Sequence, residues 1–164
     1  MPFTPLHLGP GVLLGLPLRN LLHVPTLLLA SVILDLEPLF VFVFGLNYPL
    51  HGYFHTFLIA IPTGSVLGYL MHSIDPHLKE LYRSLKLVDR DLGLKSFILS
   101  GILGASMHVA FDSPLYSDIR PFWPLASNPM YEPSQFIPIS DFCIASAALG
   151  LIYYIFLSIS GALK

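Results

Sequence analysis

The stretch FCIASAALGLIYYIFLSISGAL, residues 142–163, contains no charged side chain in 22 consecutive positions. A helix that crosses the hydrocarbon core of a bilayer needs about 20 mostly apolar residues, so this stretch predicts a membrane-spanning helix. The whole chain has the same character, since 54% of its 164 residues are hydrophobic and only 11% are charged. A typical soluble domain has about 25% charged residues. We therefore expect an integral membrane protein.

Four other apolar stretches extend this prediction, and they cover residues 5–22, 25–46, 53–71 and 96–111. The first is punctuated by glycine and proline, and whether it spans, kinks or re-enters stays open. The second contains Asp35 and Glu37 in mid-span. We expect an all-α, polytopic helical bundle with about five membrane segments, forming one domain over residues 1–164.

Two connections are more polar. Residues 72–95 carry nine of the 18 charged side chains and predict a short amphipathic helix followed by a loop. Residues 113–138 contain six prolines and the single Trp, which is typical of an extended interfacial loop. Five of the eight Lys and Arg side chains lie in residues 79–95. Because cytoplasmic loops are rich in basic residues, we expect 72–95 to be cytoplasmic.

With this topology, alternating helices bring buried polar residues to one depth near the outer side of the membrane. These residues are His7, Asp35, Glu37, His51, His55, His108 and Asp112. The spacing within two pairs, His51 with His55 and His108 with Asp112, is four residues. Residues four apart share one helix face, so each pair can bind one ion.

A carboxylate in hydrocarbon costs roughly 2.5–3.5 kcal/mol on insertion scales. A divalent cation is the simplest counter-charge for Asp35 and its neighbours. The predicted metal ligands are His7, Asp35, His51, His55, His108 and Asp112. Cys143 is the only cysteine, so the ligands are nitrogen and oxygen. Zinc is the first expectation, with manganese or iron as alternatives.

Other polar residues have more than one interpretation. His23, His72 and His77 fall on the cytoplasmic side and are expected to be interfacial or core histidines. Glu37 is either a residue that orients a ligand or a general base. For Arg120 an interfacial anchor and a phosphate clamp are equally supported.

The pattern resembles the YdjM-like family of membrane-bound, metal-dependent hydrolases, described as LexA-binding and associated with the inner membrane. The matching stretches are TPLHLGPG (4–11), ASVILDLEPL (30–39), HGYFHTFL (51–58) and SMHVAFDSPLYSDIRPFWP (106–124). Gly52 stands where the family commonly has Arg, Phe54 where it has Thr, and Glu37 replaces an Asp. These departures concern substrate contacts more than metal binding.

The family is in turn similar to the zinc-dependent phospholipase C group of all-helical phosphoesterases. That likeness implies that Asp112 bridges two metal ions. Its further His-x3-acid motif has no counterpart here, because no histidine follows His108, so one or two ions are expected rather than three.

The resulting hypothesis is a membrane-embedded metal-dependent hydrolase that acts on a phosphoester of a lipid or lipid-linked substrate. Asp35 or Glu37 would orient water, and Arg120 would contact the substrate. Membrane lipids are the expected partners, and the net charge of −2 argues against nucleic acid. The alternatives are a metal-ion or proton transporter, and a non-catalytic membrane protein with a structural metal.

Overall fold

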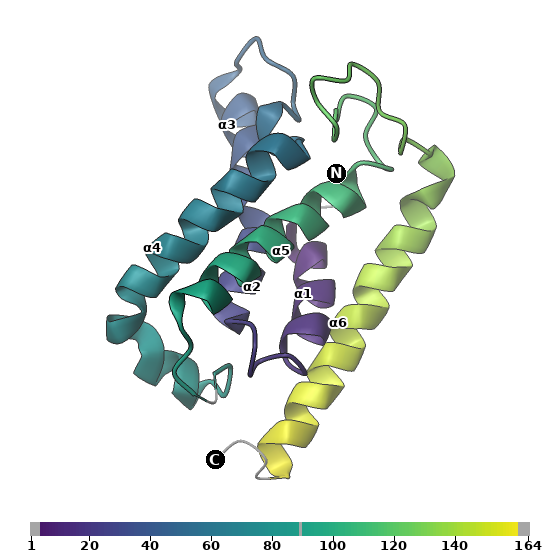
Figure 1. The fold of residues 1–164 in the computed structure, drawn as a ribbon. Coiled ribbons are helices and arrows are strands. Elements are labelled where there is room, and N and C mark those ends of the chain that lie inside the picture. The colour runs from purple at the N-terminus through teal and green to yellow at the C-terminus, as the bar shows by residue number, and fades with distance from the viewer. Residues whose placement is uncertain (1–3, 89, 161–164) are drawn as a thin grey trace.

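The computed structural model describes residues 4–88 and 90–160, and this part of the chain folds into helices joined by loops and turns (Figure 1). The helices are α1 (Leu8–Gly15), α2 (Val24–Ile33), α3 (Leu36–Phe44), α4 (Phe57–Ser84), α5 (Leu94–Asp112) and α6 (Phe136–Ile159). Short 3₁₀ turns cover Thr4–His7, Tyr53–His55 and Pro133–Gln135. The predicted all-α helical bundle is confirmed.

Four helical segments are long and apolar enough to cross a membrane: Val24–Phe44, Phe57–Ser84, Leu94–Asp112 and Pro133–Ile159. The stretch 5–22, expected as a fifth and weaker segment, is not among them. It contains only the eight residues of α1, and a helix of that length rises about 12 Å. Helix α1 instead packs against α6 and α2 within the bundle.

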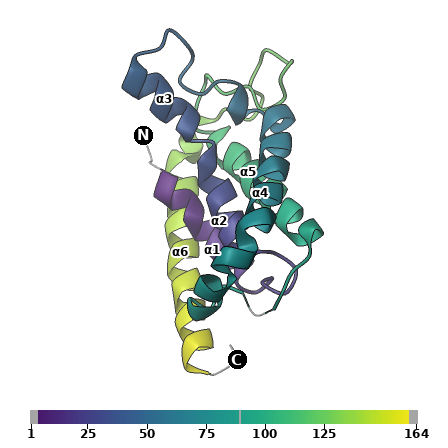
Figure 2. The ribbon, with the colours of Figure 1, turned by 90° about the vertical axis from the view of Figure 1, so that its left-hand side faces the viewer.

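The segment Val24–Phe44 is not one continuous helix, because α2 ends and α3 begins around Asp35. Pro38 has no N–H group, so it cannot donate to the carbonyl of Leu34. The Glu37 N–H donates to that carbonyl at 3.0 Å, which tightens the turn. Helix α3 leans away from the rest of the bundle (Figure 2). The break sets Asp35 at the junction of the two helices.

Helix α4 differs from the prediction at both ends. The spacing of His51 and His55 predicted that both lie on one face of a helix; this was wrong. The helix begins at Phe57, because the Thr56 side chain caps it by accepting a hydrogen bond from the Ile59 N–H at 3.3 Å. It then continues to Ser84, so the amphipathic stretch expected after residue 72 is the last part of the same helix.

Helix α5 packs against both α4 and α2, and glycines allow the close approach. A Cβ atom on Gly64 would collide with the backbone of Gly101, and one on Gly104 would collide with the carbonyl oxygen of Leu27 and crowd the Ala30 side chain. These contacts fix how far α5 lies from its neighbours. The carboxyl end of α5, the start of α4 and the loops beside them meet at one end of the bundle (Figure 1).

The loop after α5 is anchored across this end of the bundle. The Asn128 side-chain amide donates to the carbonyls of Ser113 and Tyr116 at 2.7 and 3.1 Å. The Phe57 N–H donates to the Pro121 carbonyl at 2.9 Å, which ties the loop to the start of α4. Ile119 is fully buried. The loop is thus held in place beside the polar residues described next.

Candidate metal centre

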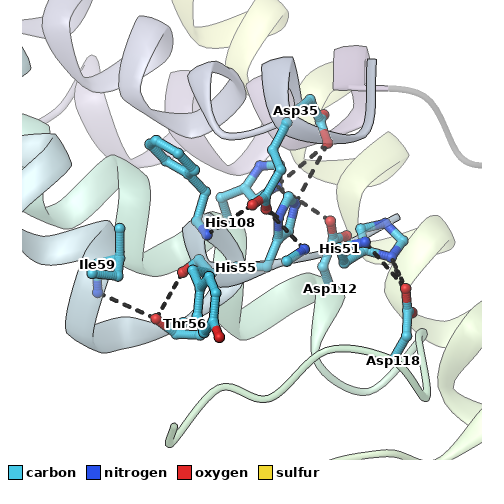
Figure 3. Close-up of polar contacts among 12 residues, drawn as sticks. Asp35, His51, His55, Thr56, Ile59, His108, Asp112 and Asp118 are labelled. Atoms are coloured by element: carbon cyan, nitrogen blue, oxygen red, sulfur yellow. Dashed lines mark hydrogen bonds and ion pairs between the residues drawn. The ribbon is translucent and has the colours of Figure 1, made fainter. Parts of the chain in front are cut away.

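Four of the predicted ligands converge at this end of the bundle: Asp35, His55, His108 and Asp112. One ligand atom from each lies within 4.8 Å of the other three. Asp35 comes from the α2–α3 junction, His55 from the 3₁₀ turn before α4, and the last two from the final turns of α5 (Figure 3). Segments far apart in the sequence therefore supply two imidazoles and two carboxylates to one point.

The orientation of the two imidazoles is set by their outer nitrogens. His108 Nδ1 lies 2.8 Å from the Ser31 carbonyl oxygen, and His55 Nδ1 lies 3.0 Å from Glu37 Oε2. A carbonyl oxygen and a carboxylate can only accept, so each Nδ1 carries the hydrogen. In the neutral rings each Nε2 then has a bare lone pair, and the two Nε2 atoms face each other at 3.2 Å. Two facing lone pairs call for a cation or proton between them.

The carboxylates surround the same point. Asp112 Oδ2 lies 3.3 Å from His108 Nε2. Asp35 Oδ1 lies 3.5 Å from His108 Nε2 and 3.9 Å from His55 Nε2. Both imidazoles and Asp112 are nearly or fully buried, whereas the Asp35 side chain is 19% exposed. Solvent can therefore reach this group of four residues from the side of Asp35.

The charges at this point favour a cation. Burial alone would lower the pKa of His55, but its interactions with the carboxylates of Asp35 and Glu37 outweigh burial and raise the pKa to about 9. A donor set of two imidazoles and two carboxylates, with no thiolate, suits a divalent ion such as zinc, manganese or iron. By donor type and geometry these four residues could hold a metal ion.

Glu37 does not join the four ligands but holds one of them. Besides His55 Nδ1, its Oε2 accepts from the Gly52 N–H at 2.9 Å. Its Oε1 accepts from the Phe54 N–H and the Tyr48 hydroxyl, both at 3.3 Å. With four donors around it, Glu37 organises the turn that presents His55. Of the two roles left open by the sequence, these contacts favour the orienting one over the general base.

His7 lies beside the centre, against Asp112. Its Nε2 is 3.0 Å from Asp112 Oδ1, and its ring centroid is 4.6 Å from that of His108. His7 Nδ1 and Asp112 Oδ1 are both buried without a hydrogen-bond partner among the described residues. Asp112 thus presents one oxygen to the four-residue group and the other to His7.

His51 also lies beside the centre, although its backbone is in a loop rather than a helix. Its ring centroid is 4.9 Å from that of His55 and 4.2 Å from that of Tyr116. Its Nδ1 lies 3.1 Å from both carboxylate oxygens of Asp118. Asp118 was missed in the sequence, because a loop residue 67 positions away from His51 leaves no periodic signal. The run of polar residues around it in the proline-rich loop was the only available hint.

A cavity of about 270 Å³ adjoins His51. Its walls include Tyr53, Thr56, Asp118, Arg120 and Trp123. The guanidinium group of Arg120 has no hydrogen-bond or ion-pair partner in the part of the chain that the structure describes. Burial and the charge of Asp112 raise the pKa of the nearby Tyr116 hydroxyl, which therefore stays protonated.

The histidines expected to be unrelated to the site lie elsewhere. His23 and His72 pack on the ring of Phe97, with ring centroids 4.0 and 5.1 Å from it. Phe97 lies in the first turn of α5, at the opposite end of that helix from Asp112. His77 is exposed on α4.

Comparison of the chain with protein-family models, with curated proteins and with solved structures finds no match. The resemblance to the YdjM-like hydrolases stays a prediction.

Proposed function

We propose that the protein is a membrane-embedded metal-dependent hydrolase, with Asp35, His55, His108 and Asp112 holding a divalent ion at one end of the helical bundle. The observation that supports this most directly is the approach of the two Nε2 atoms to 3.2 Å, with both Nδ1 atoms committed to acceptors. Zinc is the first expectation for this set of nitrogen and oxygen donors.

A bound divalent ion would supply Lewis-acid chemistry, acidifying water and neutralising charge that develops on a substrate oxygen. The chain itself would do three things. Glu37 and the Ser31 carbonyl keep the ligand rings in one tautomer, which is how buried partners of metal-bound histidines act. The burial of His55, His108 and Asp112 excludes bulk water. Asp35, the most exposed of the four, is placed to orient a water molecule arriving from outside.

The number of ions is proposed as one or two. Asp112 Oδ1 and His7 Nδ1 are buried without hydrogen-bond partners among the described residues, and His7 Nε2 lies 3.0 Å from Asp112 Oδ1. A second ion beside Asp112 would satisfy that oxygen and use the predicted ligands His7 and His51. A carboxylate that binds through both oxygens is suited to two ions that share a substrate oxygen.

The substrate proposed is a phosphoester of a lipid or a lipid-linked molecule. Arg120 lines the cavity next to His51 and has no side-chain partner among the described residues, and guanidinium groups bind phosphate oxygens in a fork. Trp123 and Tyr53 line the same cavity, and such rings prefer the interface between membrane and water. A headgroup in this cavity would bring its ester bond next to the metal centre.

The test is metal analysis and hydrolysis by the purified full chain. We expect bound zinc, and release of phosphate or a phosphorylated headgroup from phospholipid micelles that stops when a chelator removes the metal. Arg120→Ala should weaken substrate use while leaving metal content intact. Arg90→Ala should change neither, because Arg90 lies in the connection between α4 and α5, does not line the cavity and donates to the Asn20 carbonyl. A protein that binds no divalent ion would contradict the proposal.

A structural metal is a second candidate, because four protein ligands are enough to fill a tetrahedral site. The two candidates differ in whether a position on the ion stays open. With cobalt as the probe, a closed four-ligand site gives a visible spectrum that ignores added phosphate. A catalytic site should instead change its spectrum when phosphate is added, because the phosphate would bind to the cobalt ion.

We also propose the orientation, with residues 72–95 cytoplasmic and the metal centre toward the outer side. Five of the eight basic residues in 79–95 support it. In a Cys143→Ser background, a Ser127→Cys variant should react with a membrane-impermeant thiol reagent added to intact cells, and a Ser84→Cys variant should not. Both serines are exposed, so the reverse pattern would invert the proposed orientation.

A further inference from the structure

Asp118 contacts His51 more extensively than an incidental surface carboxylate would. Both of its oxygens lie 3.1 Å from His51 Nδ1, and Oδ2 also accepts the backbone N–H of His51 at 3.1 Å. His51 is buried, and its ring packs between His55 and Tyr116. One carboxylate therefore fixes both the backbone and the ring of His51 (Figure 3), a histidine that lines the cavity and packs against His55.

Asp118 is itself held by a rigid segment. The next residue, Ile119, is fully buried, and the Asn128 side chain bonds the carbonyl of Tyr116, two residues earlier. The carboxylate keeps its place even though its side chain is 39% exposed to the cavity side. Its contact with His51 is a fixed part of the site.

The arrangement repeats what Glu37 does for His55 and the Ser31 carbonyl does for His108. In each case an acceptor faces Nδ1, so Nδ1 carries the hydrogen and Nε2 keeps the lone pair. The two contacts of the Asp118 carboxylate with His51 Nδ1, both at 3.1 Å, therefore define the tautomer of this ring in the same way.

We infer that Asp118 is a positioning residue, which holds His51 in the tautomer with hydrogen on Nδ1 and so keeps the Nε2 lone pair free at the boundary between the cavity and the metal centre. The purpose of this lone pair rests on the proposed function, since it would serve a second ion or the substrate. The tautomer itself does not depend on metal.

Asp118→Asn should reverse the tautomer while keeping the shape. The backbone N–H of His51 requires an acceptor, so the new amide places its oxygen there and turns its NH₂ group toward Nδ1. A donor facing Nδ1 drives the hydrogen to Nε2, as an Asp-to-Asn change does next to a catalytic histidine in a serine protease. Asp118→Ala removes the acceptor altogether and should also abolish the preference for hydrogen on Nδ1.

The experiment is ¹⁵N NMR of the full chain labelled at histidine, in detergent micelles at pH 7.5 after treatment with a chelator. The His51 signals are identified by their loss in His51→Gln. We expect hydrogen on Nδ1 of His51 in the native protein, and on Nε2 for the major form in both Asp118 variants. Asp141→Asn, an exposed aspartate on α6, should leave the His51 signals unchanged.

Two results would overturn the inference. One is hydrogen on Nε2 of His51 in the native protein, or on Nδ1 in all variants. The other is loss of zinc binding by Asp118→Asn together with unchanged His51 signals, which would mean that Asp118 supports the whole centre structurally. Because the NMR is done without metal, the tautomer of His51 can be determined even if the protein proves not to be a hydrolase.

Discussion

Two clusters of buried histidine lie at opposite ends of α5 and differ in one respect. At the carboxyl end, the Nδ1 atoms of His55 and His108 face acceptors, so their Nε2 lone pairs converge. At the amino end, the Nδ1 atom of His23 accepts from the Thr26 N–H at 3.4 Å. The hydrogen of His23 is therefore on Nε2, which lies 3.4 Å from Asp75 Oδ1.

The difference teaches that burial beside a carboxylate does not make a histidine a ligand. His23 caps α2 with the nitrogen lone pair that a metal would need, whereas the Nε2 atoms of His55 and His108 cap no helix and face each other at 3.2 Å. What decides the role is the chemical nature of the partner on the other ring nitrogen.

The layer between the two clusters is apolar and tightly packed. Leu27, Ala30 and Ala105 are fully buried there, and Gly104 touches the backbone of α2. A transport path would need polar groups or water across this layer, so the packing argues against the transporter that the sequence left as an alternative.

The largest effect should come from His108→Ala or Asp112→Ala. Either change removes a proposed ligand and breaks the buried contact between His108 and Asp112, leaving the other member of the pair without this partner. Metal affinity should fall by more than the roughly 10- to 100-fold cost of losing a ligand's outer partner, and stability by about 3–5 kcal/mol. Metal analysis and denaturant unfolding in micelles measure both. His77→Ala should change neither metal affinity nor stability. An equal loss in His77→Ala would contradict the proposed difference between the two ends of α5.

A pH effect should come from the His23 end. Burial and the charge of His72 lower the pKa of His23 to about 4, despite the carboxylate 3.4 Å away. Between pH 6.5 and 4 the unfolded chain binds a proton at His23 that the folded chain does not. The free energy of unfolding should therefore fall as pH falls through this window, by about 3 kcal/mol from this group.

His23→Asn is the matched variant, because Asn is a good helix cap that does not titrate. Its unfolding free energy, measured in micelles at pH 7 and pH 4, should fall less than that of the native protein. An equal fall would place the sensitivity at other groups.

An intermediate effect is expected for Glu37→Gln. The amide can turn its NH₂ group toward His55 Nδ1 and so disturb the ring that Glu37 now holds. Zinc affinity, measured by competition with a chelating dye, should fall about 10- to 100-fold with the ligands intact. The exposed Glu80, which pairs with Arg83 on α4, serves as the control through Glu80→Gln. Unchanged affinity in Glu37→Gln would deny Glu37 its orienting role.

The smallest effect is expected for Thr26→Val, which removes the hydroxyl 2.7 Å from His23 Nδ1. The Thr26 N–H still donates to His23 Nδ1, so only the hydrogen bond of the hydroxyl is lost. Unfolding should become easier by about 1 kcal/mol, with no change in metal content. A loss of metal would show that the two ends are coupled through α2.

Much of the site could be read from the sequence because helix spacing encodes it. His108 and Asp112 are four residues apart on an uninterrupted helix, and the structure brings both to the centre. Asp35 and His55, which the sequence predicted at the same depth, lie close to this pair in the structure. His51 and His55 do lie side by side, but for a different reason than predicted, since a loop and a 3₁₀ turn hold them rather than a helix.

What could not be predicted depends on contacts between distant segments. The start of α4 is set by the Thr56 cap and by the hydrogen bonds of Glu37 to the turn, and neither follows from apolar periodicity. The short α1 shows that hydropathy alone does not reveal where glycine and proline end a helix. Asp118 reaches His51 only because the loop after α5 folds back over the bundle.

The glycine contact between α5 and α2 has a mechanical consequence for the chemistry. Gly104 lies one helical turn before His108, and a Cβ atom there would press on the stretch of α2 that ends at Ser31. The Ser31 carbonyl accepts from His108 Nδ1 and so orients the imidazole ring. A methyl group at this position would therefore push α5 and α2 apart, and Gly104→Ala should move the Ser31 carbonyl relative to His108 Nδ1 without changing any of the four residues that could hold an ion.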